Sequence, residues 1–265
     1  MPKRSVIFFI TGCIIVTLTL ALFIFVKMNY VVPILMYHSV SPFATKENRL
    51  SVSHASFERQ MRFLKDRHYN VVSLTSLAEM IKHKQRIPRR TVVLTFDDGY
   101  RDNFTYAFPV LKKYNLPATM FVIINEIGRS QGDRLTWDQI HQMKRSGIIT
   151  FGSHALGPEP LVNIAHPAEL KNEIFDSKRA LEEKLKTPVE AFSYPEGRFN
   201  PAIRQLVKDA GYTVAVATSP GKGYPDDDVW ALKRLRISST SDNLFVFWFE
   251  ITGIYTFIKE HRDDP

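Results

Sequence analysis

The chain has very little cysteine: of its 265 residues, only Cys13 is one. Residues 31–265 therefore cannot form a disulfide and offer no thiol nucleophile. The sequence also lacks internal repeats, a Gly-x-Gly-x-x-Gly loop and the helix-turn-helix, RRM and zinc-finger patterns of nucleic-acid-binding proteins. Its formal net charge of +8 suggests attraction to an anionic surface, such as lipid head groups or an acidic polymer. We expect no nucleic-acid partner.

One long apolar run lies near the N-terminus. It extends from Val6 to Val26 and follows Lys3 and Arg4. At about 1.5 Å per residue, the run spans about 30 Å, the thickness of a hydrocarbon core. We expect an uncleaved transmembrane anchor in residues 1–30 and one domain in residues 31–265; a cleaved signal peptide is the alternative. The positive charge before the run favours an exported domain, in the periplasm or at the cell surface.

After this run, short apolar segments alternate with amphipathic ones. This alternation predicts an α/β fold with a mainly parallel sheet. A polar loop is expected up to residue 53, and the segment 232–254 is expected to form a strand followed by a helix rich in Phe and Trp. Strands are expected at residues 31–37, 70–74, 92–96, 118–123, 148–151, 189–194 and 213–217, with helices between them, including 107–114, 137–146, 167–185 and 201–210.

Two adjacent carboxylates, Asp97 and Asp98, follow the strand expected at 92–96. Burying both without compensation is costly. A metal ion is the simplest compensation, because one carboxylate can bind it while the other stays free as a base. His154 follows another strand and could be a second ligand. A structural alternative stays open for each. The aspartates could cap a helix, and His154 could be a hydrogen-bonded core histidine.

The candidate functional residues all lie at the carboxyl ends of predicted strands, where catalytic groups lie in α/β barrels. Four of these strand-end motifs resemble those of the polysaccharide deacetylase family, the carbohydrate esterases with a NodB homology domain (family 4). They are Leu35–His38, Thr95–Gly99, Phe151–His154 and Phe192–Gly197. The resemblance implies a distorted (β/α) barrel, and it looks closest to the exported branch that acts on poly-N-acetylglucosamine. A Rossmann-type open sheet is the competing fold.

The resemblance also implies a metal site. Asp98 and His154 match the family's aspartate and first histidine ligands, but Pro158 stands where a second histidine is expected. Glu159 could replace that ligand, and Glu196 is a second candidate. The expected cofactor is a divalent cation, Zn, Mn, Co or Ni. Carboxylate ligation would shift the preference towards harder metals such as Mn, Mg or Ca.

By the same resemblance, Asp97 is the general base and the backbone N–H of Glu196 helps to hold the oxyanion. An arginine often found in the family two positions before the proline of the third motif is Ser193 here. Arg236 is expected to supply that charge and pair with Asp97, with Arg234 as the alternative. The alternative is that these arginines lie on a solvated edge strand and have only a structural role.

Four further residues are expected to contact substrate: His38, Tyr100, Tyr194 and Pro195. His38 could instead make a structural hydrogen bond or orient Asp97, and large aromatic side chains often belong to the core.

The predicted function is a metal-dependent hydrolase that removes N-acetyl groups from an exported polysaccharide. The expected partners are that polymer, the membrane and other polysaccharide export proteins. Because of Pro158, the alternative is a catalytically impaired carbohydrate-binding or assembly protein on the same scaffold. An aspartate-based phosphatase is disfavoured, since it needs its two aspartates one residue apart and a loop that cradles phosphate.

Overall fold

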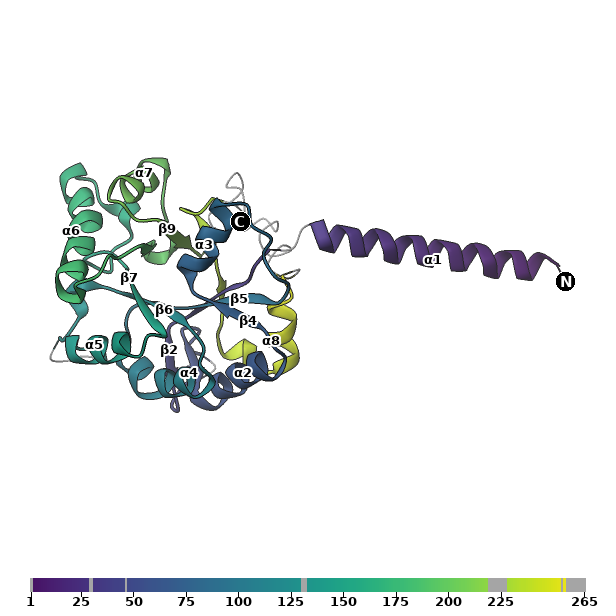
Figure 1. Cartoon of the computed structure of the whole chain (residues 1–265), viewed down its shortest axis with the longest axis horizontal. Helices are drawn as coiled ribbons and strands as arrows, with labels where there is room; N and C mark the ends of the chain where they lie inside the picture. The colour runs from purple at the N-terminus through teal and green to yellow at the C-terminus, as the bar shows by residue number, and fades with distance from the viewer. Residues whose placement is uncertain are drawn as a thin grey trace.

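The computed structural model describes residues 2–28, 31–45, 47–129, 133–218, 228–253 and 255. The first of these segments forms α1 (Pro2–Met28), which extends away from the rest of the chain (Figure 1). Within the described parts of the chain, no helix is both long enough and apolar enough to cross a membrane. The structure therefore does not support the transmembrane part of the fold prediction.

Residues from β1 onward form a barrel-like parallel sheet surrounded by helices (Figure 1). Along the sheet, neighbouring strands follow the order β10-β9-β8-β7-β6-β5-β1-β11, and every pairing is parallel. The strands are β1 (Ile34–Tyr37), β5 (Thr91–Phe96), β6 (Ala118–Val122), β7 (Ile149–Ser153), β8 (Ala191–Ser193), β9 (Val214–Ala217), β10 (Leu232–Lys233) and β11 (Leu235–Arg236).

One short segment joins the two edges of this sheet. β10 pairs with β9, whereas β11 pairs with β1. A single residue, Arg234, separates β10 from β11. β4 (Asn70–Val72) lies off this path and pairs with the first half of β5, while β6 pairs with its second half. These irregularities give a distorted α/β barrel, so the barrel part of the predicted fold class is confirmed.

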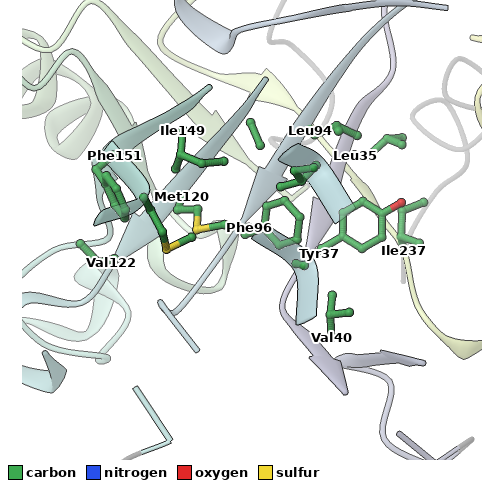
Figure 2. Close-up of a cluster of buried hydrophobic side chains, with 14 of the residues drawn as sticks. Leu35, Tyr37, Val40, Leu94, Phe96, Met120, Val122, Ile149, Phe151 and Ile237 are labelled. Atoms are coloured by element: carbon green, nitrogen blue, oxygen red, sulfur yellow. The ribbon is translucent and has the colours of Figure 1, made fainter. Parts of the chain in front are cut away.

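The barrel strands are buried on both faces, as parallel strands covered by helices are. Figure 2 shows the apolar side chains that β1, β5, β6 and β7 contribute to one core cluster. Within this cluster, Tyr37 stacks on Phe96 with ring centroids 5.3 Å apart. The Tyr37 hydroxyl donates a hydrogen bond to Gln60 of α2 at 2.9 Å, so this buried polar group is satisfied.

Most helices have a recognisable start. Ser53 caps α2, and Thr136 forms a capping box with Gln139 at α5. The helices are α2 (His54–Asp66), α3 (Leu74–Lys82), α4 (Phe108–Tyr114), α5 (Trp137–Arg145), α6 (Pro167–Leu185), α7 (Pro201–Asp209) and α8 (Leu244–Glu250). Shorter turns are the π-helical η1 (Asn103–Ala107) and the 3₁₀ turns η2 (Ile124–Glu126), η3 (Leu161–Asn163), η4 (Pro195–Gly197) and η5 (Ser239–Asp242).

The structure differs from the sequence-based expectation in two segments. The polar loop expected before α2 contains a parallel pair, β2 (Ser39–Ser41) and β3 (Ser51–Ser53), which Asp102 secures by accepting hydrogen bonds from the Ser39 hydroxyl and the Val40 N–H. Strands this short carry no readable alternation. The segment expected as one strand and a helix at 232–254 forms β10, β11, η5 and α8, and residue 254 lies outside the described residues.

Candidate active site

A pocket of about 400 Å³ lies at the carboxyl end of the barrel. Asp97 and Asp98 follow β5, His154 follows β7, and the Pro195–Gly197 turn follows β8. Parallel strands bring these ends together, although the residues are far apart in the sequence. The pocket is lined by Met36, His38, Leu50, Asp97, Asp98, Ile123, His154, Pro158, Pro195, Glu196, Gly197, Thr218 and Arg236.

Asp97 is held by a buried arginine. Its Oδ1 and Oδ2 accept hydrogen bonds from Nη1 and Nη2 of Arg234 at 2.7 and 2.6 Å. The same guanidinium donates to the hydroxyls of Ser193, at 2.9 Å, and Thr95, at 3.3 Å. Burial alone would raise the pKa of Asp97, but the charges of Arg234 and His154 hold it well below its usual range. The carboxylate is therefore ionised at neutral pH.

His154 is oriented by the backbone. Its Nδ1 lies 2.8 Å from the carbonyl oxygen of Ser193, which leaves Nε2 directed at the two aspartates. Nε2 lies 3.4 Å from Oδ1 of Asp98 and 3.9 Å from Oδ2 of Asp97. Burial would lower the pKa of His154, but the two carboxylates raise it overall. An imidazole bonded to a carbonyl through one nitrogen and facing carboxylates with the other has the arrangement of a metal ligand.

Two turns with left-handed backbone shape the pocket. Asp98 and Gly99 have φ angles of 65° and 63°, and a Cβ on Gly99 would lie 2.9 Å from Cγ1 of Val122. Glu196 and Gly197 have φ angles of 55° and 69°. A Cβ on Gly197 would lie 2.5 Å from the backbone nitrogen of Thr218. Glycine is therefore required at both second positions, and left-handed non-glycine residues such as Asp98 and Glu196 are typical of functional turns.

Comparison with known proteins agrees with this arrangement. A sequence profile described as polysaccharide deacetylase matches residues 84–215. YxkH of Bacillus subtilis (strain 168), whose name assigns it to the polysaccharide deacetylases, is 35% identical over 206 residues, which are 78% of this chain and 71% of that protein. The chain belongs to the polysaccharide deacetylase family. The predictions of the family and of its hydrolase class are thus confirmed.

Two other similar proteins illustrate the range of the similarity. The poly-beta-1,6-N-acetyl-D-glucosamine N-deacetylase of Staphylococcus aureus (strain MRSA252) is 25% identical over 209 residues, 75% of this chain and 72% of that protein. The solved structure of the Streptococcus pyogenes deacetylase PplD in complex with acetate superposes with a TM-score of 0.72 at 29% identity, over 82% of this chain and 97% of that one.

Polysaccharide deacetylases are generally metal-dependent, and the residues here fit a divalent cation in part. Asp98 supplies a carboxylate and His154 an imidazole nitrogen, both at the pocket floor. Pro158 lines the pocket but has no donor atom in its side chain. Among the described residues, no group of three or more His, Cys, Asp or Glu side chains is placed to hold a metal ion.

The expected substitute ligand, Glu159, does not reach this pair. Its side chain is exposed and accepts a hydrogen bond from Asn163 at 2.6 Å, and it does not line the pocket. Glu196 does line the pocket, but its carboxylate is exposed and lies 3.6 Å from Arg198. The structure therefore corrects the assignment of Glu159 as a ligand. Of the predicted ligands Asp98, His154 and Glu159, the described part of the chain places the first two in the pocket.

The arginine paired with Asp97 is Arg234, which corrects the choice of Arg236. Arg234 occupies the break between β10 and β11 and is 4% exposed, whereas Arg236 is exposed at the pocket mouth. Ser193, the position of the expected arginine, is instead a small partner: its hydroxyl accepts from Arg234 and lies 3.4 Å from Oδ2 of Asp97. The serine leaves room for the Arg234 guanidinium, which enters from the break between β10 and β11.

Of the four residues expected to contact substrate, two line the pocket and two do not. His38 and Pro195 line the pocket. Tyr194 is fully buried, stacks on Phe199 with centroids 4.4 Å apart and donates its hydroxyl hydrogen bond to the Trp230 carbonyl, so its assignment is wrong.

Tyr100 also lies outside the pocket lining. It is half-buried beneath the Arg134 guanidinium, which lies 4.1 Å from its ring centroid.

Sequence reasoning missed Thr218 and Met36 in the pocket wall. Thr218 follows β9 and Met36 lies within β1. Thr218 carried the same strand-end signal as the aspartates, since it directly follows an apolar run. Met36 carried no signal, because an apolar residue in an apolar strand is indistinguishable from core.

Proposed function

We propose that this chain is a metal-dependent deacetylase that removes N-acetyl groups from an exported polysaccharide of the poly-N-acetylglucosamine type. The observation that carries the proposal is the cluster of Asp97, Asp98 and His154 on the floor of an open pocket, with Arg234 holding Asp97 ionised. The Staphylococcus aureus relative, which acts on poly-beta-1,6-N-acetyl-D-glucosamine, supports the substrate class.

Asp98 and His154 would hold the divalent cation. When bound, such an ion polarises a carbonyl oxygen and lowers the pKa of water towards about 7. Asp97 would then take the proton from the attacking water on a carboxylate oxygen. Its two hydrogen bonds to Arg234 fix the carboxylate plane, so the base is positioned before substrate arrives.

The backbone N–H of Glu196 would stabilise the oxyanion as the acetyl carbon becomes tetrahedral. One well-placed donor of this kind contributes about 3 kcal/mol to transition-state stability. The left-handed conformation at Glu196 and Gly197 fixes the orientation of this peptide. The donor thus comes from the backbone, and the exposed Glu196 side chain is not required for it.

His38 would carry the proton to the departing amine. It lines the pocket opposite the strand ends of β7 and β8, and its buried Nδ1 has no hydrogen-bond partner among the described residues. Burial lowers the pKa of its imidazole, so the ring is neutral at pH 7. It would take up the proton that Asp97 removed from the attacking water and pass it to the amine nitrogen. Cleavage of the C–N bond then releases acetate and a protonated sugar amine.

Acetate release is the direct test. The full chain, solubilised in mild detergent and stripped of metal, would be given partly acetylated glucosamine oligomers with each of several divalent metals. We expect metal-dependent release that falls at least about 100-fold in Asp97→Asn, because the base is lost. Glu159→Gln is the matched control, since Glu159 lies outside the pocket, and it should keep full activity.

A second function is favoured by one observation, the presence of Pro158 in the pocket wall where a metal histidine is expected. We propose it as the alternative: a carbohydrate-binding or assembly protein that has lost turnover. Oligomer binding by a folded chain, with no acetate released in the presence of any metal, would decide in its favour.

We further propose that the chain acts outside the cytoplasm, attached to a membrane by its apolar N-terminal run and working beside polysaccharide export proteins. The support is the sequence: Lys3 and Arg4 precede the run from Val6 to Val26. Protease added to intact cells or spheroplasts should digest the domain while the membrane fraction retains the N-terminal segment. A domain protected until the membrane is dissolved would contradict this location.

A further inference from the structure

The outer face of α8 exposes large aromatic side chains. Phe245, Trp248 and Phe249 are 70%, 42% and 41% exposed. Trp248 and Phe249 follow Phe245 by three and four residues, so all three lie on one face of the helix. The opposite face is also apolar and buried, through Phe247 and Ile251. A surface helix normally places polar residues on its outer face. The outer face of α8 is therefore suited to contact something other than water.

A groove of about 560 Å³ runs beside these aromatic residues. Phe245 and Trp248 form one wall, and Arg67 and Arg90 lie in its lining. Both arginines are exposed, and Arg90 donates a hydrogen bond to the Arg67 carbonyl at 3.1 Å, which holds the two cations at one site. We call the surface formed by Phe245, Trp248, Phe249, Arg67 and Arg90 the aromatic–arginine surface.

This surface lies at the end of the barrel opposite the catalytic pocket. Arg67 precedes β4 and Arg90 directly precedes β5, so both lie where strands begin, whereas Asp97 lies where β5 ends. β1 also begins at this end, since Ile34 pairs with Val93 of β5. The chain enters β1 from α1, which extends from the edge of the barrel where α8 lies (Figure 1).

We propose that the aromatic–arginine surface docks onto an anionic phospholipid bilayer. Aromatic rings favour the interface between hydrocarbon and head groups. Guanidinium groups beside them match the lipid phosphates, as does the net charge of +8. The proposal rests on the proposed membrane location and adds the contact surface. Docking by this surface turns the catalytic pocket away from the lipid, by roughly 20 Å along β5, towards a polymer outside.

Quenching of tryptophan fluorescence by brominated lipid tests the contact. The full chain would be reconstituted into vesicles of brominated phosphatidylglycerol or brominated phosphatidylcholine. We expect a quenched component with phosphatidylglycerol that disappears in Trp248→Phe, a variant that keeps an aromatic ring. Phe245→Ser should also reduce it. Phe43→Ser is the matched control, because Phe43 is 84% exposed but follows β2 at the catalytic end, and it should leave the quenching unchanged.

Charge reversal tests the arginines. Arg67→Glu and Arg90→Glu should each lower the ratio of docked to undocked chain at least about fivefold, while Arg179→Glu on α6 should not. Flotation with the vesicles is measured in parallel. If the chain floats with the vesicles but shows no Trp248-dependent quenching, the anchor is retained and only the docking proposal is overturned. If the chain does not float, both the docking proposal and the proposed membrane location are overturned. Shielding of Trp248 that depends on protein concentration rather than on brominated lipid would indicate a second copy of the chain, and also overturns it.

Discussion

Arg234 and Asp97 form a buried ion pair, with exposed fractions of 4% and 2%. Such a pair contributes little net stability compared with apolar residues, but breaking it by removing one partner leaves an uncompensated buried charge. The pair therefore makes Asp97, the proposed catalytic base, costly to alter. Loss of activity in Asp97→Asn must be separated from loss of folding, which requires a variant that removes both charges.

A double-mutant cycle makes this separation. Asp97→Asn and Arg234→Met should each lower the free energy of unfolding by about 3–5 kcal/mol, because each leaves one buried charge unpaired. The double variant should lose markedly less than the sum, because neither charge remains. Urea denaturation of the three variants measures this. An additive double variant would mean that the two groups do not interact in solution.

The stability of the chain should also depend on pH through Asp97. Its pKa in the folded chain lies well below the unfolded value of about 3.9. The stability that it contributes is therefore present above pH 4 and is lost as the pH falls towards the folded pKa. Between pH 5 and pH 3, the free energy of unfolding should fall more steeply in the wild type than in Asp97→Asn, by up to about 1.4 kcal/mol per pH unit. Equal slopes would contradict this role for Asp97.

At the residue scale, the sequence could predict which groups gather but not every partner. Asp97, Asp98 and His154 were identifiable because each follows an apolar strand, and parallel strands bring such ends together. Arg234 could not be distinguished from Arg236, because both lie in one short segment. The choice depends on the break between β10 and β11, which directs Arg234 inward and which no sequence periodicity predicts.

The loop after β7 is the element that distinguishes the proposed metal site from the family pattern. It carries His154 into the pocket and then places Pro158 in the pocket wall. Glu159 is already outside, bonded to Asn163. The sequence suggested Glu159 because it is adjacent to the missing ligand, but adjacent side chains in this bent loop point in different directions: Pro158 lines the pocket and Glu159 does not. Only the backbone path decides which of them reaches the metal.

Restoring the missing donor tests this view of the loop. Pro158→His should raise the affinity for Zn²⁺ at least about tenfold, since three protein ligands are usual for catalytic zinc. Titration with a competing chelator measures it. Glu159→His is the matched control, because its side chain would start from an exposed position, and it should leave the affinity unchanged. An equal gain in both variants would mean that the loop rearranges around the metal.

At the scale of the whole molecule, the alternation of strands and helices was readable because parallel strands buried on both faces are continuous apolar runs. Closure of the barrel was not readable. It depends on β10 and β11, each two residues long, pairing with opposite edges of the sheet. The pairing of β2 with β3 was equally hidden, since it relies on hydrogen bonds from Ser39 and Val40 to Asp102 rather than on an apolar pattern.

Because Asp98 and His154 come from different strands, a metal ion held between them would link β5 to β7 and stabilise the whole barrel. A ligand that binds only the folded chain raises its unfolding free energy by about 2.7 kcal/mol at 100 times the dissociation constant. The melting temperature of the full chain should therefore rise with added Zn²⁺ or Mn²⁺ and fall on chelation. The rise should be absent in His154→Ala and retained in His141→Ala, which alters a histidine on α5. A rise that persists in His154→Ala would place the stabilising ion elsewhere on the molecule.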